Sequence, residues 1–270
     1  MKIKVLDNGY VRLVESYGRG DAGIMEAGII EAARQSTQGN FRGWDIWHCG
    51  TCGNNFKSKI NHDISGGLDE LSSSSLVICK QKNWSNDEKL LGFLFNNEPK
   101  HSTPFEFCGL IIEVQAPIFV FREWHRHRTQ SYNEMSARYA PLPDMNYVPD
   151  KERLFLTQNE NKQAQAISGS KQLDDNYAEG WLSELAILYE RAEKVYQYGL
   201  DVGIPKEVAR VVLPVGRYSK MRASANLLNW LKFLSLRMDS KAQWEIRQYA
   251  NAVAEIISNE FPKTWSQFKK

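Results

Sequence analysis

The feature that most constrains the fold of this chain is a 23-residue stretch that begins at Pro117 and reads PIFVFREWHRHRTQSYNEMSARY. Pro117 suits a first helical position. At about 100° per residue, Ile118, Phe121 and Trp124 fall on one stripe, which predicts a short buried helix. Residues 129–138 have no apolar period and predict a loop. A buried helix that leads an Arg-His-Arg cluster into a polar loop suits an anionic, planar ligand.

Motif residues in this stretch resemble a known family. Arg126, His127 and Arg128 are followed by seven residues and then Ser136, and the run RHR-x-x-S-x-N-E-x-S-x-R-Y continues the pattern to position 139. Both are motifs of the flavin-dependent thymidylate synthases, which the chain therefore resembles. On charge alone, the basic residues fit a solvent-exposed helix end as well as they fit a ligand-binding site. The extended match to the motif favours the ligand-binding site.

Other segments resemble the same family. They are HSTPFEF at 101–107, where Phe107 replaces the family's last His, E-x-A-R-x-x-L-P at 207–214, N-x-x-N-W-L-x-F-L-x-L-R at 226–237 and A-Q-W-E-I-R at 242–247. The resemblance is strong over 84–148 and 205–265 and weak over 1–43. It implies an α+β fold, with a mixed or antiparallel sheet flanked by helices and no Rossmann unit.

Composition argues against nucleic-acid-binding, membrane and disulfide-rich secreted proteins. The net charge of +2 gives no global field for nucleic acid or membrane, but six basic and two acidic residues between Glu207 and Asp239 suit a small phosphorylated ligand. No apolar run approaches the roughly 18 residues of a membrane span. The first 16 residues alternate like a strand and lack a signal-peptide core. Four cysteines in 270 residues make no disulfide framework, so we expect a cytoplasmic location.

A glycine motif near the N-terminus is a false lead. Gly18 opens a literal GxGxxG that ends at Gly23, after a strand and before a helix. A dinucleotide-binding unit needs a second parallel strand after that helix, whereas residues 35–43 read as loop. We therefore expect a turn in which Asp21 caps a helix over 22–34, and no flavin there.

Residues 45–83 predict a surface insertion within a single domain of 1–270. Cys49 and Cys52 form a CGxCG turn like those of zinc ribbons, and the remaining ligands could only come from His48, His62 and Cys79. A mobile insertion without metal is the favoured interpretation, because glycine and serine runs lie nearby.

The remaining chain predicts a series of helices and strands. They are a helix over 86–97 opened by a capping box at 85–88, a strand over 108–115, a loop over 140–175, a helix over 176–200, a short helix from 205, a strand over 217–226, a helix over 227–237 and a closing helix over 242–257.

The resemblance implies the reductive methylation of dUMP to dTMP. In the family, 5,10-methylenetetrahydrofolate supplies the carbon, NADPH supplies the reducing equivalents and FAD carries the hydride. The family assembles as a homotetramer whose active sites are shared between subunits. That suits a chain whose arginines at 126–138 and 210–237 lie on separate elements.

The resemblance also assigns site residues. Those expected to contact FAD are Arg126, His127, Arg128, Thr103, Glu106, Glu134 and Asn226, with Leu228 and Lys232 at further cofactor positions and His101 near the flavin. Those expected around dUMP are Glu123, Arg126, Glu134, Met135, Ser136, Ala137, Arg138, Arg210 and Arg237. Ser136 and Arg138 would hold the phosphate, and Arg237, the catalytic candidate, would lie against the pyrimidine.

Three positions depart from the family pattern. Glu123 replaces a Gln, so its carboxylate must be neutralised, by Arg122 or Arg126, if a phosphate lies near. Leu228 replaces an Arg that contacts FAD, and Lys232 replaces a His or Asn and restores that charge. An enzyme that methylates or hydroxymethylates dCMP would share every motif.

A rival from another class is a nucleic-acid-binding module, in which Arg, His, Tyr and Trp hold phosphates and stack bases. It predicts basic charge spread along a groove, and it gives no reason for Glu134 within the loop.

Overall fold

The computed structural model describes residues 1–19, 25–44, 86–99, 101–156 and 172–269, together with the backbone of 47–49, 55–56 and 81–83. The described chain divides into two compact units. The first comprises Met1–Ser16 with Gly109–Asn259, and the second Tyr17–Cys108 with Glu260–Lys270.

The first unit is built on a five-stranded sheet in the order β1-β2-β6-β8-β7. Its strands are β1 (Lys2–Val5), β2 (Gly9–Tyr17), β6 (Gly109–Pro117), β7 (Ser131–Glu134) and β8 (Tyr218–Asn226). β6 and β8 pair antiparallel along their full length, and β7 pairs antiparallel with the other edge of β8. The α+β prediction with an antiparallel sheet is confirmed, and the part of the chain that the structure describes contains no Rossmann unit.

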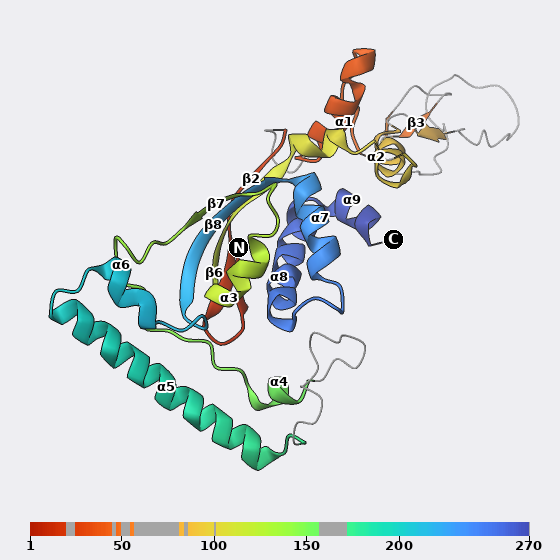
Figure 1. Cartoon of the computed structure of the whole chain (residues 1–270). Helices are drawn as coiled ribbons and strands as arrows, with labels where there is room; N and C mark the ends of the chain where they lie inside the picture. Colours follow the sequence, from red (N-terminus) through yellow and green to blue (C-terminus); the bar gives the residue numbers. More distant parts are fainter. Residues whose placement is uncertain are drawn as a thin grey trace, which may run out of the picture. The chain divides into compact units, whose positions relative to one another are not determined.

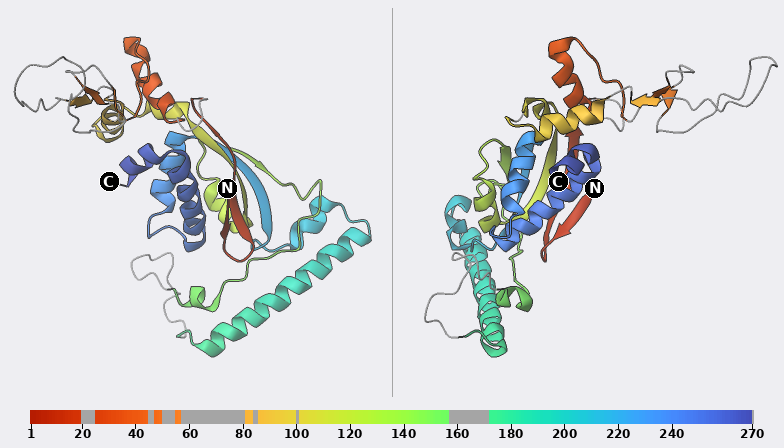
Figure 2. Two further views of the ribbon diagram at one scale, coloured as in Figure 1. Left: turned by 180° about the vertical axis from the view of Figure 1, so that it is seen from behind. Right: turned by 90° about the vertical axis from the view of Figure 1, so that its right-hand side faces the viewer.

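The two faces of this sheet differ in polarity because side chains alternate along each strand. On β6, Leu110, Ile112 and Val114 are fully buried. Helices α3 (Ile118–Trp124), α7 (Leu227–Arg237) and α8 (Trp244–Glu260) belong to the same unit, and Figures 1 and 2 show α7 and α8 beside the sheet. Trp230 of α7 donates its indole N–H to the Leu110 carbonyl at 3.1 Å, and Tyr249 of α8 donates its hydroxyl to the Gln115 carbonyl at 2.9 Å. The apolar face is thereby fastened to its helices.

A long helix, α5 (Asp175–Asp201), leads to α6 (Lys206–Ala209), as Figure 1 shows. The 3-10 turn η4 (Arg210–Val212) follows α6. Asp174 caps α5 by accepting the Tyr177 N–H at 2.9 Å. Arg217, which is fully buried, places its Nη1 2.8 Å from carboxylate oxygens of both Asp144 and Glu193 of α5. The predicted helices at 176–200 and from 205 are confirmed.

The second unit contains α1 (Ala27–Arg34), η1 (Gln35–Thr37), α2 (Asp87–Asn96), η2 (Thr103–Phe107) and α9 (Pro262–Phe268), with the short strands β3 (Trp47–Cys49), β4 (Asn55–Phe56) and β5 (Gln81–Asn83). Asp87 is fully buried, pairs with Arg34 and accepts the backbone N–H groups of Arg42 and Gly43 at 2.8 and 3.1 Å. This carboxylate ties α1, α2 and the turn at 42–43 together.

Several expectations need correction. Residues 131–134 form an edge strand and not the predicted loop. The strand is held by backbone hydrogen bonds to β8, and an exposed edge strand does not need the apolar alternation on which the prediction relied. A short helix, α4 (Lys151–Phe155), interrupts the predicted loop at 140–175, where the Asp150 side chain accepts the Arg153 N–H at 2.8 Å. The N-terminal helix begins at Ala27, with Glu26 at its N-cap, and not at position 22 as predicted; Asp21, the predicted cap, lies outside the described residues.

Other expectations stay untested. Gly20–Gly23 of the glycine motif and Ser85 of the predicted capping box are not described, and Asn86 occupies the N-cap of α2. The cysteine turn is described only in the backbone of Cys49, whereas Cys52, His62 and Cys79 lie outside the described residues. Within the described part of the chain no cluster of His, Cys, Asp and Glu could hold a metal. No described helix combines the length and the apolar character needed to cross a bilayer.

Candidate active site

The Arg-His-Arg cluster lies in a turn that its neighbours hold in place. β6 runs directly into α3, which ends at Trp124, so the chain leaves the helix before the cluster and the cluster no longer follows helical spacing. Tyr132 donates its hydroxyl to the carbonyls of Trp124 and His127 at 3.1 and 2.7 Å. Gln130 accepts the Trp124 indole N–H at 3.0 Å. Outside this scaffold, the two flanking arginines, 126 and 128, are exposed.

Arg237, the last residue of α7, meets this turn with three hydrogen bonds of 2.8 Å each. Its Nε donates to His127 Nε2, its Nη1 to Glu123 Oε2 and its Nη2 to the Glu123 carbonyl. The structure therefore brings together three of the predicted site residues, although the arginine stands 110 positions after the histidine.

The cluster fixes the protonation state of His127. Because Arg237 donates to Nε2, that nitrogen is an acceptor and the ring proton sits on Nδ1. Burial, followed by the nearby Arg237 cation, lowers the pKa of His127 to about 4, although the Glu123 carboxylate acts in the opposite direction. His127 is thus a neutral imidazole, packed edge-to-face on Phe233 at 4.9 Å.

The partner expected for Glu123 is corrected by this geometry. Sequence alone pointed to Arg122 or Arg126, one and three positions away. The carboxylate instead pairs with Arg237 across the boundary between α3 and α7. The sequence pattern near Glu123 does not predict this ion pair, because the two residues meet only when α3 and α7 pack on the same sheet.

The loop after β7 makes a second cluster. Ser136 starts a turn in which its hydroxyl and carbonyl accept the backbone N–H groups of Arg138 and Tyr139 at 3.3 and 3.0 Å. Arg138 pairs with Glu207 of α6 at 3.0 Å, and Arg210 donates to the Glu207 carbonyl at 3.4 Å. The two arginines predicted at the nucleotide phosphate thus share a neighbour.

Glu207 is a residue that sequence reasoning missed as part of the site. Its signal was its position three residues before Arg210 on a predicted helix, a spacing that brings side chains together. Met135 and Ala137 complete the loop: the Met135 N–H donates to the Lys220 carbonyl at 2.8 Å, and Ala137 is buried.

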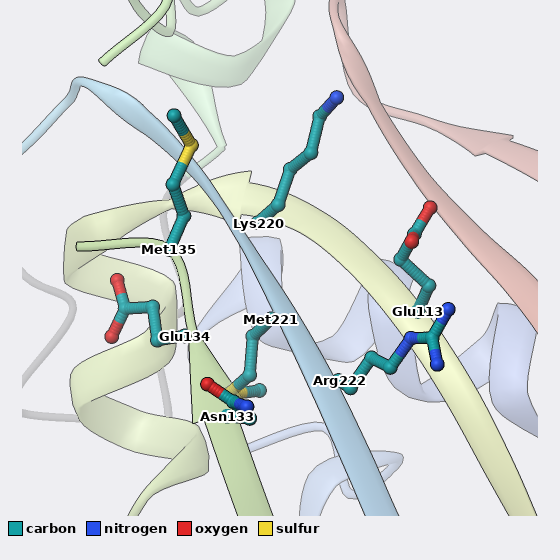
Figure 3. A pocket seen from close by; sticks show the side chains of 7 residues that line it. All are labelled: Glu113, Asn133, Glu134, Met135, Lys220, Met221 and Arg222. Carbon is teal, nitrogen blue, oxygen red and sulfur yellow. The ribbon is translucent and has the colours of Figure 1, made fainter. Parts of the chain in front are cut away.

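A shallow cavity of about 250 Å³ lies where β7 meets β8. Its lining comprises Glu113, Asn133, Glu134, Met135, Lys220, Met221 and Arg222 (Figure 3). Figure 3 shows Lys220 and Met221 on opposite sides of β8. Glu134 stands opposite Met221 in the strand register, so it lies on the same face as α3, whose C-cap residue His125 contacts the Met221 sulfur at 3.2 Å. Glu134 and the Arg-His-Arg turn therefore belong to one face of the sheet.

The start of α7 carries three more predicted residues. Asn226 ends β8 and caps α7, where its Oδ1 accepts the Asn229 N–H at 3.0 Å. This contact uses the amide oxygen, and among the described residues no hydrogen bond from the side-chain NH₂ is seen. Leu228 and Lys232 lie one turn apart on the same helix, and Lys232 is exposed.

The last three predicted residues belong to the second unit. Phe105 anchors η2 in the core, whereas Thr103 and Glu106 on the same turn are exposed. His101 is exposed and stacks on Phe93, with ring centroids 5.7 Å apart. This segment thus presents its polar side chains outward.

Comparison with known proteins adds independent evidence. The family model described as "Thymidylate synthase complementing protein" matches residues 26–263. The flavin-dependent thymidylate synthases of Thermus thermophilus and Thermotoga neapolitana are 33% and 34% identical to this chain over all 270 residues, which cover 79% and 95% of those proteins.

Among solved structures, a UMP/dUMP methylase, PolB from Streptomyces cacaoi, is similar in its complexes with 5-Br UMP and 5-Br dUMP. The TM-score is 0.69 for both, with 28% and 29% identity, 99% of this chain covered and 96% and 97% of those chains covered. Together these matches span the sheet, the Arg-His-Arg turn and the Arg237 cluster. The chain belongs to the flavin-dependent thymidylate synthase family, and it is a methyltransferase.

Proposed function

We propose that this enzyme reductively methylates dUMP to dTMP, with FAD as the hydride carrier, NADPH as the reductant and 5,10-methylenetetrahydrofolate as the carbon donor. The observation that carries the proposal is the 2.8 Å hydrogen bond from Arg237 to His127. This bond places the arginine assigned to the pyrimidine next to the histidine assigned to the flavin. Hydride transfer between the flavin and the pyrimidine requires the two ligands to lie side by side.

Arg237 would activate the base. Methylation at C5 of uracil needs electron density at C5, which grows as N3 loses its proton or O2 gains negative charge. Two unit charges about 4 Å apart at an effective dielectric of about 20 interact by roughly 4 kcal/mol. The guanidinium side chain is only 16% exposed, so water screens it little. Glu123 offsets part of this charge.

Ser136, Arg138 and Arg210 would hold the nucleotide phosphate. A guanidinium fork and a hydroxyl suit phosphate oxygens, and both arginines are exposed around Glu207. In this role the phosphate displaces the Glu207 carboxylate from Arg138. An exposed ion pair of this kind costs little to break, typically about 0–1 kcal/mol.

The residues present fit a flavin. Arg126 and Arg128 are exposed cations for a diphosphate, His127 has an Nδ1–H donor, and Asn226 keeps an amide donor. A bound flavin supplies hydride transfer. The protein's own contribution is to orient the ring through these donors and to hold the His127 ring neutral.

We also propose that residues 1–270 act as one catalytic domain with a surface insertion at 45–83, and that the enzyme is a homotetramer with shared active sites. The exposed apolar side chains Trp181, Leu188 and Val195 of α5 support association between copies of the chain.

A second candidate is methylation of UMP. The similarity to a methylase whose substrates include both UMP and dUMP favours it, since the two nucleotides differ only at the 2′ position of the ribose. None of the contacts described above discriminates at that position.

The test is tritium release from 5-tritiated dUMP, UMP and dCMP in parallel, with and without NADPH and methylenetetrahydrofolate. We expect a flavin spectrum in the purified protein and release from dUMP that depends on both co-substrates. Release from UMP at equal or higher kcat/KM would favour the second candidate. A flavin-loaded protein that releases no tritium from any of the three would overturn both.

A further inference from the structure

We propose that Glu123 is the positioning residue of this site: it holds the Arg237 guanidinium in place and, through it, the orientation and tautomer of His127. This inference rests on the proposed function for the roles of Arg237 and His127. The contacts themselves are independent of that function.

Glu123 holds Arg237 at two points. Its carboxylate and its backbone carbonyl each accept a guanidinium N–H at 2.8 Å. The carbonyl belongs to the last turn of α3, where carbonyls lack helical partners and cations are favoured. Arginine carries five N–H donors. Glu123 and His127 take three of them, so two remain for a ligand, in a plane that the three acceptors define.

His127 depends on the same arrangement. Its ring packs on Phe233, its carbonyl accepts the Tyr132 hydroxyl and its Nε2 accepts the Arg237 Nε–H. The first two contacts fix the position of the ring, and only the third selects the tautomer. A guanidinium released by Glu123 would rotate among its rotamers, and His127 would then exchange its proton between both nitrogens.

Two substitutions separate the charge of the Glu123 carboxylate from its role as a hydrogen-bond acceptor for Arg237. Glu123→Gln keeps the backbone carbonyl that accepts from Nη2 and offers an amide oxygen to Nη1, so it removes only the charge. Glu123→Ala removes the side-chain anchor entirely. Because the guanidinium remains charged, its hydrogen bond to the amide oxygen is still charge-assisted on the donor side, so the amide retains part of the anchoring. Glu123 is 42% exposed at its side chain, so we expect both variants to fold.

The first measurement is ¹⁵N NMR of histidine-labelled full-length protein, with the His127 signals assigned from His127→Gln. We expect a single Nδ1–H tautomer in the wild type and in Glu123→Gln, and a mixture of tautomers in Glu123→Ala. Steady-state kinetics with dUMP should show kcat lowered about threefold in Glu123→Gln and about thirtyfold in Glu123→Ala, with a smaller change in KM. The matched control is Glu190→Ala, which removes an exposed carboxylate paired with Lys194.

Two outcomes overturn the inference. One is a Glu123→Ala variant that keeps the single tautomer and a kcat within twofold of the control. The other is equal loss in both variants, since the amide oxygen offers Nη1 an acceptor in the same place. Failure of the proposed function can be distinguished from failure of this inference. If the proposed function is wrong, the wild type releases no tritium from dUMP, whereas the NMR measurement of the His127 tautomer still tests the role of Glu123.

Discussion

At the scale of single residues, Arg237 is held in a plane that a lysine cannot reproduce. Arg237→Lys keeps the charge but loses the fork that reaches Glu123 and His127 together. We expect kcat to fall about 100-fold, a cost of about 3 kcal/mol, with nucleotide affinity largely kept. Steady-state kinetics and direct titration with dUMP measure the two parameters.

The matched substitution is Arg138→Lys, at the proposed phosphate site. Its guanidinium is exposed and paired with Glu207, so a lysine supplies the charge there, and the main expected effect is a higher apparent KM. The reverse pattern, with Arg237→Lys defective only in binding, would show that Arg237 holds the nucleotide and does not activate it.

His127 also makes the stability of the protein depend on pH. Its pKa is lowered from 6.5 to about 4 in the folded state, first by burial and then by Arg237. Between these values the unfolded chain binds a proton that the folded chain does not, so stability falls as the pH falls through that window. We expect His127→Gln to lose less stability than the wild type between pH 6.5 and 4.

Urea unfolding at a series of pH values measures this dependence. His125→Gln, which changes an exposed ring two positions earlier, is the matched control. An equal acid dependence in His127→Gln, in the control and in the wild type would contradict a neutral His127.

At the scale of elements, α5 is fastened by a buried cation. Arg217 is fully buried, and its Nη1 lies 2.8 Å from both Asp144 and Glu193 of α5, while Nη2 donates to the Leu142 carbonyl at 3.2 Å. Breaking a buried ion pair by removing one partner costs about 3–5 kcal/mol. Because Asp144 is mostly exposed, we expect Arg217→Met to lose about 3 kcal/mol, at the lower end of that range.

Chemical denaturation measures that loss, and hydrogen exchange along α5 locates it. The control is Lys194→Met, which breaks an exposed pair with Glu190 on the same helix and should cost less than about 1 kcal/mol. Loss of equal size in both variants would mean that the buried cation does not anchor α5.

At the scale of the whole molecule, α5 presents an apolar stripe to solvent. Trp181, Leu188, Val195 and Val202 recur every seven residues along the helix and its C-cap, and each is between 40% and 57% exposed. A seven-residue repeat of apolar side chains is the pattern of helices that pair with other helices. We interpret the stripe as a contact between copies in the proposed homotetramer.

Leu188→Lys should therefore lower the oligomeric state, measured by light scattering after gel filtration, with helical content unchanged. Glu190→Lys places the same charge about 200° round the helix and is the control. A tetramer that survives Leu188→Lys would exclude this stripe from the interface, and a monomeric wild type would exclude the tetramer.

Local patterns were sufficient for much of this protein. The helix before the Arg-His-Arg turn, the helices at 176–200 and 227–237 and the strand between 217 and 226 follow from residue periodicity and its boundary signals. The family motif around 126–139 identified the site because its residues are contiguous. Residues 131–134 escaped detection, since an exposed edge strand needs only backbone partners.

The sequence by itself determined the longer helices and strands, the family and the identity of the candidate site residues. The tertiary structure decided their pairing. Arg237 meets His127 over 110 positions, and Arg138 meets Glu207 over 69, because separate elements converge there. Whether Glu123 opposes a phosphate or holds an arginine depends on that convergence. Charge and periodicity are local properties of a chain, whereas a hydrogen bond between distant residues exists only after the sheet and its helices have packed.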